Sequence, residues 1–167
     1  MLKRFYPGEY LDSTYVIDFD RLYKDGYRGI IFDIDNTLVP HGAPADERAI
    51  ALFRHLRELG FSYCLLSNNQ IERVSSFADA IDAQFIENAH KPSVRNYKKA
   101  MELLETNTGN TIFIGDQLFT DVYGAKRSGI RNILVKPIHP KEEIQIVLKR
   151  YLEKIVLHFY KKEEGIS

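Results

Sequence analysis

The alternation of short apolar runs with longer segments of helical periodicity is the feature that most constrains how this chain can fold. Short runs rich in β-branched and aromatic residues occupy positions 29–33, 63–66, 84–86, 111–114 and 131–135. Between them, apolar residues recur every three to four positions over 45–59, 71–81, 93–104 and 118–128. Such alternation is typical of βαβ units. It predicts an α/β fold in which a five-stranded parallel sheet is flanked by helices.

The chain is expected to form a single domain. Its 167 residues are enough to bury a sizeable core. No internal repeat, low-complexity stretch or Gly/Ser-rich linker interrupts the sequence. We therefore expect one domain, 1–167, that consists of an N-terminal extension (1–27), a core (28–137) and a C-terminal helix (141–163).

Charge and cysteine content exclude several classes of protein. The 23 Lys and Arg residues balance the 23 Asp and Glu residues, so no global charge attracts nucleic acid, and no nucleic-acid partner is expected. The single cysteine, Cys64, lies in an apolar run and is expected to be a buried thiol. No apolar stretch approaches the ~20 residues of a membrane-spanning helix, and the N-terminus lacks a signal-peptide pattern. We expect a cytoplasmic protein.

Two carboxylates follow the first expected strand at the point where the apolar run stops. Asp33 and Asp35 are two residues apart in the segment Asp33-Ile-Asp-Asn-Thr-Leu38. In a parallel sheet, ligands bind at the carboxyl ends of the strands. Such a pair can divide a task, because one carboxylate can attack as a nucleophile while the other transfers protons.

The next three strands also end in polar residues. Ser67, with Asn68 and Asn69, offers a hydroxyl and backbone amides for a phosphoryl oxygen, and Lys91 can place an ammonium near developing negative charge. The fourth strand is followed by Gly115, which favours a tight turn, and by two further carboxylates, Asp116 and Asp121. Hard oxygen ligands favour Mg²⁺.

Each of these elements alone is common as a helix cap, a turn or a surface lysine. All four, however, fall in order at the ends of four successive strands. Together they supply the groups needed for metal-assisted phosphoryl transfer. The sequence therefore predicts an enzyme.

The four elements resemble the ordered motifs of haloacid dehalogenase (HAD)-type phosphatases. The motif sequences are Asp33-Ile-Asp-Asn-Thr-Leu, Ser67-Asn68, Lys91-Pro92 and Gly115-Asp116-Gln-Leu-Phe-Thr-Asp121. The resemblance implies a Rossmann-like HAD fold whose five strands, numbered along the chain, lie in the order 5-4-1-2-3. It also implies phosphomonoester hydrolysis that depends on Mg²⁺.

The same resemblance implies a role for each motif residue. Asp33 would be the nucleophile that forms an aspartyl-phosphate, and Asp35 the general acid/base whose backbone carbonyl helps to hold Mg²⁺. Lys91 would also be catalytic. The phosphoryl group would be bound by Asn36, Thr37, Ser67, Asn68 and Lys91. The metal site would comprise Asp33, Asp35, Asp116 and Asp121, with an orienting role toward Lys91 as the alternative for Asp121.

A narrower resemblance covers nearly the whole chain. The segments that carry it are 2–10, 36–40, 67–69, 115–121 and 133–138. They are similar to the bacterial YqeG family, which resembles the phosphatidylglycerophosphate phosphatases of mitochondria and chloroplasts. This resemblance implies that the substrate is phosphatidylglycerophosphate and the product phosphatidylglycerol. A phosphoprotein or nucleic-acid phosphate as substrate, and a non-catalytic scaffold on a phosphatase fold, stay open as alternatives.

Short connections between the motifs predict an uncapped site. One helix separates Leu38 from Ser67, and one helix and a short strand separate Ser67 from Lys91. Neither connection has room for a cap domain of the kind that encloses small substrates. We therefore expect a substrate whose phosphate is attached to a large or immobile body, with a phospholipid headgroup as the favoured example.

The C-terminal helix expected over 141–163 is amphipathic. Its apolar positions are Ile144, Val147, Leu148, Tyr151, Leu152, Ile155 and Phe159. Its basic residues are nearly cancelled by Glu142, Glu143, Glu153, Glu163 and Glu164. The apolar face could pack on its own domain, form a homo-oligomer interface or contact a membrane, and transient peripheral membrane association is our working hypothesis.

Overall fold

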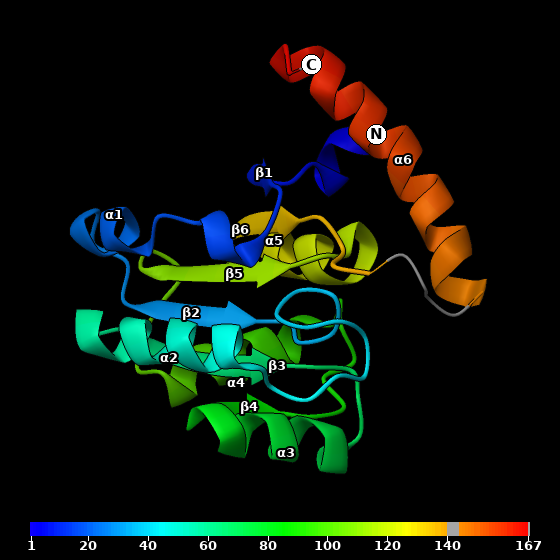
Figure 1. The fold of residues 1–167 in the computed structure, drawn as a ribbon. Helices are drawn as coiled ribbons and strands as arrows, with labels where there is room; N and C mark the ends of the chain where they lie inside the picture. The colour runs from blue at the N-terminus through cyan, green and yellow to red at the C-terminus, as the bar shows by residue number, and fades with distance from the viewer. Residues whose placement is uncertain (140–143, 167) are drawn as a thin grey trace.

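A computed structural model describes residues 1–139 and 144–166, although not the side chains of positions 144 and 145. Six strands form one parallel sheet in the order β1-β6-β5-β2-β3-β4 (Figure 1). The strands are β1 (Glu9–Leu11), β2 (Gly29–Phe32), β3 (Ser62–Leu66), β4 (Gln84–Ile86), β5 (Thr111–Gly115) and β6 (Arg131–Val135). The helices are α1 (Phe19–Lys24), α2 (Glu47–Leu59), α3 (Ile71–Ile81), α4 (Val94–Leu103), α5 (Tyr123–Arg127) and α6 (Ile144–Glu164).

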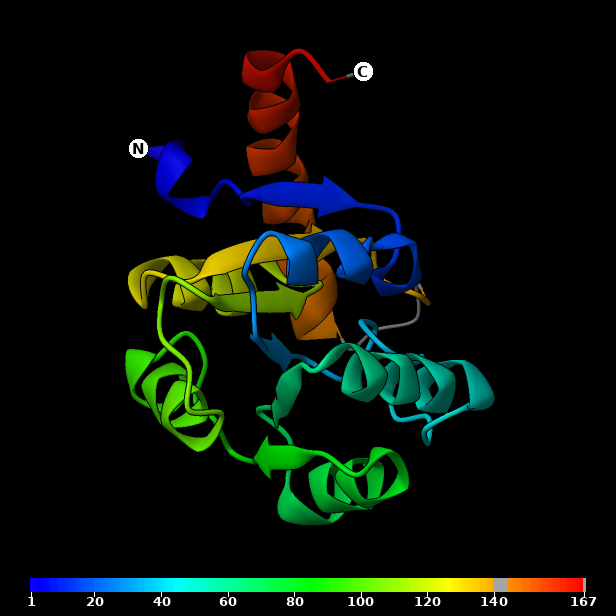
Figure 2. The same cartoon turned by 90° about the vertical axis from the view of Figure 1, so that its left-hand side faces the viewer.

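The sheet is buried on both faces because its strands are apolar at consecutive positions. All four residues of β2 are buried. Successive side chains of a strand point to opposite faces, so Ile30 and Phe32 pack with α1, α2 and α3, while Ile31 packs with α4 and α5. Cys64 of β3 is buried in the second cluster, as expected. The result is a three-layer α/β arrangement (Figure 2).

Helix boundaries follow the capping residues of the sequence. The Asp46 side chain accepts a hydrogen bond from the amide of Ala49 at 2.8 Å and so caps the start of α2. At the other end, Gly60 adopts φ 105°, the left-handed conformation that commonly ends a helix. The expected segment 118–128 is not one helix, because a π-helical turn, η3 (Leu118–Val122), precedes α5.

The prediction of five strands is wrong, because the sheet has six. The five expected strands lie in the expected order, but β1 from the N-terminal extension adds a sixth at the edge beside β6, with Glu9 opposite Ile133. Its three residues are only half-buried, so neither length nor hydrophobic alternation marks them as a strand. Residues 1–27 are thus partly integrated into the sheet.

Helix α6 packs on the domain through a face other than its apolar one. The face against the domain carries Glu153, Val156 and Tyr160, all buried. The apolar residues on the outer side, Leu148 to Phe159, are exposed. Packing of that apolar face on its own domain is therefore excluded. Residues 141–143 of the expected helix lie outside the described part of the chain. No described helix combines the length and apolarity needed to cross a membrane.

Candidate active site

The motif residues converge on one cleft at the carboxyl ends of the strands. Asp33 directly follows β2, Ser67 follows β3, Asp116 follows β5, and Lys91 lies in the loop after β4. The cleft has a volume of about 280 Å³, and six of the expected site residues line it: Asp33, Asp35, Asn36, Ser67, Asn68 and Lys91. Thr37, Asp116 and Asp121 are buried next to them. The structure thus brings together all nine residues singled out from the sequence.

Lys91 is the electrostatic centre of the cleft. Its buried ammonium donates hydrogen bonds to Asp33 at 2.8 Å and to Asp121 at 2.6 Å. Burial alone would lower the pKa of Lys91, but the charges of Asp121 and Asp33 outweigh it and raise the pKa above its usual range. Lys91 therefore stays cationic and can bind a phosphoryl oxygen.

Asp33 lines the cleft, and both of its carboxylate oxygens accept hydrogen bonds. One carboxylate oxygen accepts from Lys91, and the other accepts from the Thr37 hydroxyl at 3.2 Å. Burial raises the pKa of Asp33 to about 6, against the opposing effect of Lys91. Burial also raises the pKa of Asp116, and the nearby Asp33 charge adds to this rise. The cleft is therefore a site that favours added positive charge.

Asp121 is held in place by its own loop. One carboxylate oxygen accepts from Lys91, and the other accepts from the backbone amides of Asp116 and Gln117, both at 3.1 Å. Gly115 is needed for this arrangement, because a Cβ there would lie 2.5 Å from the Asp121 carboxylate. Its role is thus close approach, whereas the sequence suggested a tight turn. These contacts fit an orienting role of Asp121 toward Lys91.

The Asp35 side chain points toward a separate set of donors. Its carboxylate accepts from the amide of Gly42 at 2.7 Å, from the Asn69 side chain at 2.6 Å and from the Arg73 guanidinium at 3.0 Å. From the sequence, Asn69 was expected only to offer its backbone amide to a phosphoryl oxygen, and Arg73 had no expected role. The signal for both is their place after the Ser67-Asn68 motif, since Asn69 follows it directly and Arg73 lies in the first turn of α3. They fix Asp35 at the rim of the cleft.

The Ser67-Asn68 motif positions the loop that carries Lys91. The buried Ser67 hydroxyl accepts from the amide of Asn69 at 3.1 Å. The Asn68 side chain accepts from the backbone amide of Lys91 at 2.8 Å. Asn68 thereby fixes the loop that carries Lys91, in addition to lining the cleft.

Three acidic residues could hold a metal ion. Each of Asp33, Asp116 and Asp121 offers a carboxylate oxygen, and these oxygens lie within 4.8 Å of one another. All three residues are buried, and hard oxygen donors suit Mg²⁺. The Asp35 side chain does not belong to this group, which leaves its backbone carbonyl as the expected contact. The donor set therefore fits a divalent cation.

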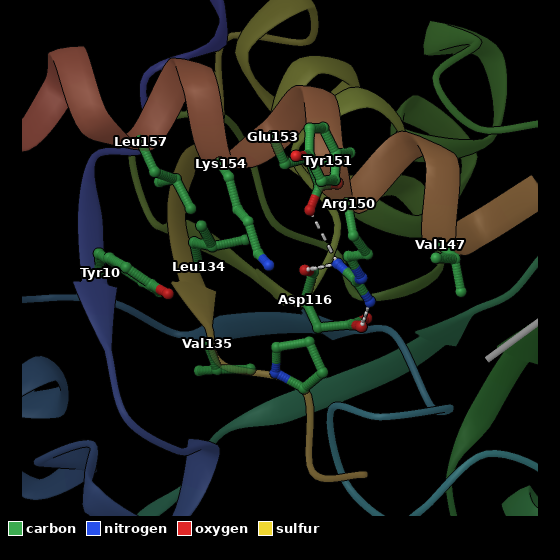
Figure 3. Close-up of a pocket in the computed structure, with 11 residues that line it drawn as sticks. Tyr10, Asp116, Leu134, Val135, Val147, Arg150, Tyr151, Glu153, Lys154 and Leu157 are labelled. Atoms are coloured by element: carbon green, nitrogen blue, oxygen red, sulfur yellow. Dashed lines mark hydrogen bonds and ion pairs between the residues drawn. The ribbon is translucent and has the colours of Figure 1, made fainter. Parts of the chain in front are cut away.

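A residue of α6 also reaches this cluster, and the sequence analysis missed it. The Arg150 guanidinium donates to the carboxylate and to the backbone carbonyl of Asp116 (Figure 3). Glu153 accepts from Arg150 at 3.0 Å and from the amide of Leu118 at 2.9 Å. The available signal was the Arg150–Glu153 pair, spaced i,i+3 on the side of the helix away from the apolar stripe.

Comparison with known proteins defines the class to which this fold and site belong. A family model described as HAD-hydrolase-like matches residues 88–143. The crystal structure of a HAD family hydrolase from Deinococcus radiodurans, with bound phosphate and sodium, superposes with a TM-score of 0.56 and 15% sequence identity. The superposition covers 74% of this chain and 87% of that one. The fold is thus that of the HAD hydrolases.

Proteins similar in sequence indicate which family of HAD hydrolases the chain belongs to. "Probable phosphatase YqeG" of Bacillus subtilis is 34% identical over 100% of this chain and 98% of its own length. "Phosphatidylglycerophosphate phosphatase 1, chloroplastic/mitochondrial" of Arabidopsis thaliana is 29% identical over 83% of this chain, which spans 45% of the plant protein. This chain belongs to the YqeG family of HAD phosphatases.

Proposed function

We propose that the protein removes the terminal phosphate of phosphatidylglycerophosphate and yields phosphatidylglycerol, with Mg²⁺ as cofactor. The observation that carries the chemistry is the buried Asp33–Lys91–Asp121 network at the floor of the cleft. The plant relative supports the choice of substrate, because its name gives that activity.

In the first step, an Asp33 carboxylate oxygen attacks phosphorus. A bond forms between Asp33 and phosphorus, and the bond from phosphorus to the glycerol oxygen breaks. Asp35 donates a proton to the departing oxygen, which leaves as an alcohol. The contacts of Asp35 with Asn69 and Arg73 keep its carboxyl group at the rim of the cleft, where that oxygen would lie.

In the second step, Asp35 acts as a base. It removes a proton from water as the water oxygen attacks phosphorus, and the bond between Asp33 and phosphorus breaks. Inorganic phosphate leaves, and Asp33 returns to its carboxylate form. The proton that Asp35 gave in the first step is thus recovered in the second.

Lys91, Ser67 and Thr37 are proposed to hold the phosphoryl group. Lys91 is already fixed by two carboxylates, so little reorganisation is needed when negative charge develops in the transition state. Asp33 and Asp116, with the backbone carbonyl of Asp35, would hold Mg²⁺. When bound, Mg²⁺ neutralises phosphoryl charge and so allows the Asp33 carboxylate to approach.

The surroundings of the cleft support a large substrate. In the described part of the chain, α2 is the only helix between β2 and β3, and α3 the only one between β3 and β4. Connections of this kind support a site without an inserted cap domain. A phosphate anchored to an extended surface such as a bilayer can approach a site of this kind.

The test is phosphate release from phosphatidylglycerophosphate in mixed micelles, with Mg²⁺ and with EDTA, beside a soluble aryl phosphate. Asp33→Asn is the inactive control, because it removes the nucleophilic charge with little change of volume. We expect Mg²⁺-dependent release that strongly favours the lipid. Release from the aryl phosphate alone would reject the lipid and leave a phosphoprotein or nucleic-acid phosphate to be tested. Absence of release from both would favour a non-catalytic scaffold.

A further inference from the structure

The outer face of α6 is a continuous apolar stripe that no other part of the described chain covers. Its members recur at three- and four-residue spacing along one side of the helix. Their exposed fractions are 68% for Leu148, 69% for Tyr151, 52% for Leu152, 48% for Ile155 and 43% for Phe159. Contiguous exposed apolar side chains of this size mark an interaction surface.

The side of α6 opposite the stripe is held against the domain by specific contacts. These contacts fix the rotation of the helix about its axis and keep the stripe exposed. Glu153 binds the amide of Leu118, and Arg150 binds Asp116. Val156 is buried against Leu118 and Leu134, and the rings of Tyr6 and Tyr160 meet edge to face at 5.3 Å. Turning the stripe inward would break these contacts and bury other charged side chains.

The exposed charge beside the stripe is cationic over positions 146–162. Exposed Glu163 and Glu164 follow only at the C-terminal end of α6, where Glu163 pairs with Lys3 at 3.1 Å. Between positions 146 and 162 the only acidic residue is Glu153. Glu153 is buried and held by Arg150 and Leu118. Lys149, Lys154 and Lys162 of the same segment are exposed. Because Glu153 is buried and paired, it does not offset the positive charge of the exposed lysines on either side of the stripe.

The apolar surface continues from the stripe into a groove beneath α6. The groove has a volume of about 410 Å³ and lies between α6 and β6 (Figure 3). Val147 and Tyr151 of α6 line it together with Leu134 and Val135 of β6, and Lys154 lies at its wall. Asp116, Arg150 and Glu153 also line the groove, and both of these carboxylates accept hydrogen bonds from Arg150. The exposed ammonium of Lys154 beside the apolar surface fits an amphiphile that has an anionic head.

The stripe also borders the active site. Ile146 and Lys149, from the first turns of α6, line the catalytic cleft. A surface that binds the stripe therefore lies beside the mouth of the cleft, at the place from which a lipid phosphate would enter.

From these observations we infer that the exposed face of α6 docks onto an anionic lipid surface, with the apolar stripe inserted among the acyl chains and the flanking lysines at the headgroups. This inference rests on the proposed function for its physiological meaning. Apolar insertion combined with cationic flanks is the pattern of interfacial helices. A second copy of the chain fits less well, because a parallel pairing of two stripes would bring the lysines of both copies together. In an antiparallel pairing, the described part of α6 would offer them only Glu163 and Glu164 at the helix end.

The test is co-sedimentation with vesicles of phosphatidylcholine alone and of phosphatidylcholine mixed with phosphatidylglycerol. We expect the full chain to bind the anionic vesicles and to bind the neutral ones much less. In Leu148→Ser/Leu152→Ser, the partition coefficient should fall by roughly a hundredfold, since each of the two leucines removed from an apolar phase is worth a factor of about ten. Lys154→Gln/Lys162→Gln should weaken binding to the anionic vesicles selectively.

Val16→Ser/Leu103→Ser is the matched control, because these two residues are also exposed but lie away from α6. It should bind vesicles like the unmodified chain. Unchanged binding in Leu148→Ser/Leu152→Ser, or no binding of the full chain to anionic vesicles, would overturn the inference. A dimer in light scattering that this variant abolishes, without vesicle binding, would assign the stripe to a second copy and also overturn it.

Failure of this inference can be told apart from failure of the proposed function. Hydrolysis of a soluble aryl phosphate should be unchanged in Leu148→Ser/Leu152→Ser, because neither residue lines the catalytic cleft. If vesicle binding depends on the stripe but phosphatidylglycerophosphate is not hydrolysed, the docking surface stands and the substrate is wrong. If the lipid is hydrolysed equally well in vesicles by both proteins, the substrate stands and the docking surface is wrong.

Discussion

Four buried carboxylates share two cations at the active site. Asp33 and Asp121 both bind Lys91, whereas Asp116 and Glu153 both bind Arg150. The carboxylates therefore exceed the cations by two, and burial raises the pKa of Asp33 to about 6, which shows that holding its charge in the folded protein is unfavourable. We therefore expect Asp33→Asn to raise the unfolding free energy of the metal-free protein by about 1 kcal/mol at neutral pH, while it abolishes turnover.

Urea unfolding in EDTA measures this effect. Asp25→Asn, at an exposed carboxylate directly after α1, is the control and should change stability by less than about 0.5 kcal/mol. A clear loss of stability in Asp33→Asn would mean that the pairing of Asp33 with Lys91 outweighs the burial of its charge.

Removal of Lys91 should lower the free energy of unfolding, in contrast to Asp33→Asn. Lys91→Met would leave the carboxylates of Asp33 and Asp121 buried without their shared cation. Breaking a buried ion pair from one side costs about 3–5 kcal/mol. We expect a loss of that order in the free energy of unfolding, together with loss of phosphate release. Lys98→Met, at an exposed position of α4, should be nearly neutral in the same urea titration.

Residues that follow strands were predictable from the sequence, and residues that reach the site from elsewhere were not. Asp33 and Asp116 were found because the ends of parallel strands meet at one edge, which is a property of topology. Arg150 comes from a helix whose placement depends on tertiary contacts. Its role could be identified only once α6 had been placed against the loop that starts at Asp116.

At the scale of elements, hydrophobic periodicity predicted the helices and central strands well but could not say which side of α6 packs. The most apolar side of α6 faces outward. The inward side is chosen by specific polar contacts, since Glu153 satisfies the amide of Leu118 and pairs with Arg150. A hydrophobic pattern does not encode such contacts. The edge strand β1 was missed for a related reason, because three half-buried residues carry too little pattern.

The contact of Arg150 with Asp116 predicts that α6 and the active-site loop are coupled. Arg150→Met should leave the Asp116 carboxylate buried without its cation and weaken the docking of α6. We expect backbone amides of α6 to exchange with deuterium roughly tenfold faster, while those of β2 and β5 stay protected. Hydrogen exchange by mass spectrometry measures both regions in one experiment. Lys162→Met is the control, and equal protection of α6 in the Arg150 variant would show that the apolar contacts and the Glu153–Leu118 hydrogen bond hold the helix without Arg150.

At the scale of the whole molecule, the acidic cluster should make the stability of the protein depend on pH. Without metal, the free energy of unfolding should fall as pH rises, whereas the stabilisation by Mg²⁺ should grow. Burial raises the pKa of Asp33 from 3.8 to about 6 and raises that of Asp116 as well. Between about pH 4 and about pH 6, the folded protein therefore holds protons that the unfolded chain has released. The free energy of unfolding of the metal-free protein should fall as pH rises through this window.

Magnesium should reverse this trend, because it binds the deprotonated carboxylates and takes the place of the protons. The rise in melting temperature caused by Mg²⁺ should thus be small near pH 4, should grow through about pH 6, where Asp33 is half ionised, and should level off above that pH. Thermal unfolding with Mg²⁺ and with EDTA across this range measures the difference directly. In Asp33→Asn the growth with pH should be much weaker, since one titrating ligand is gone. A stabilisation by Mg²⁺ that is independent of pH in the unmodified protein would place the ion away from these carboxylates.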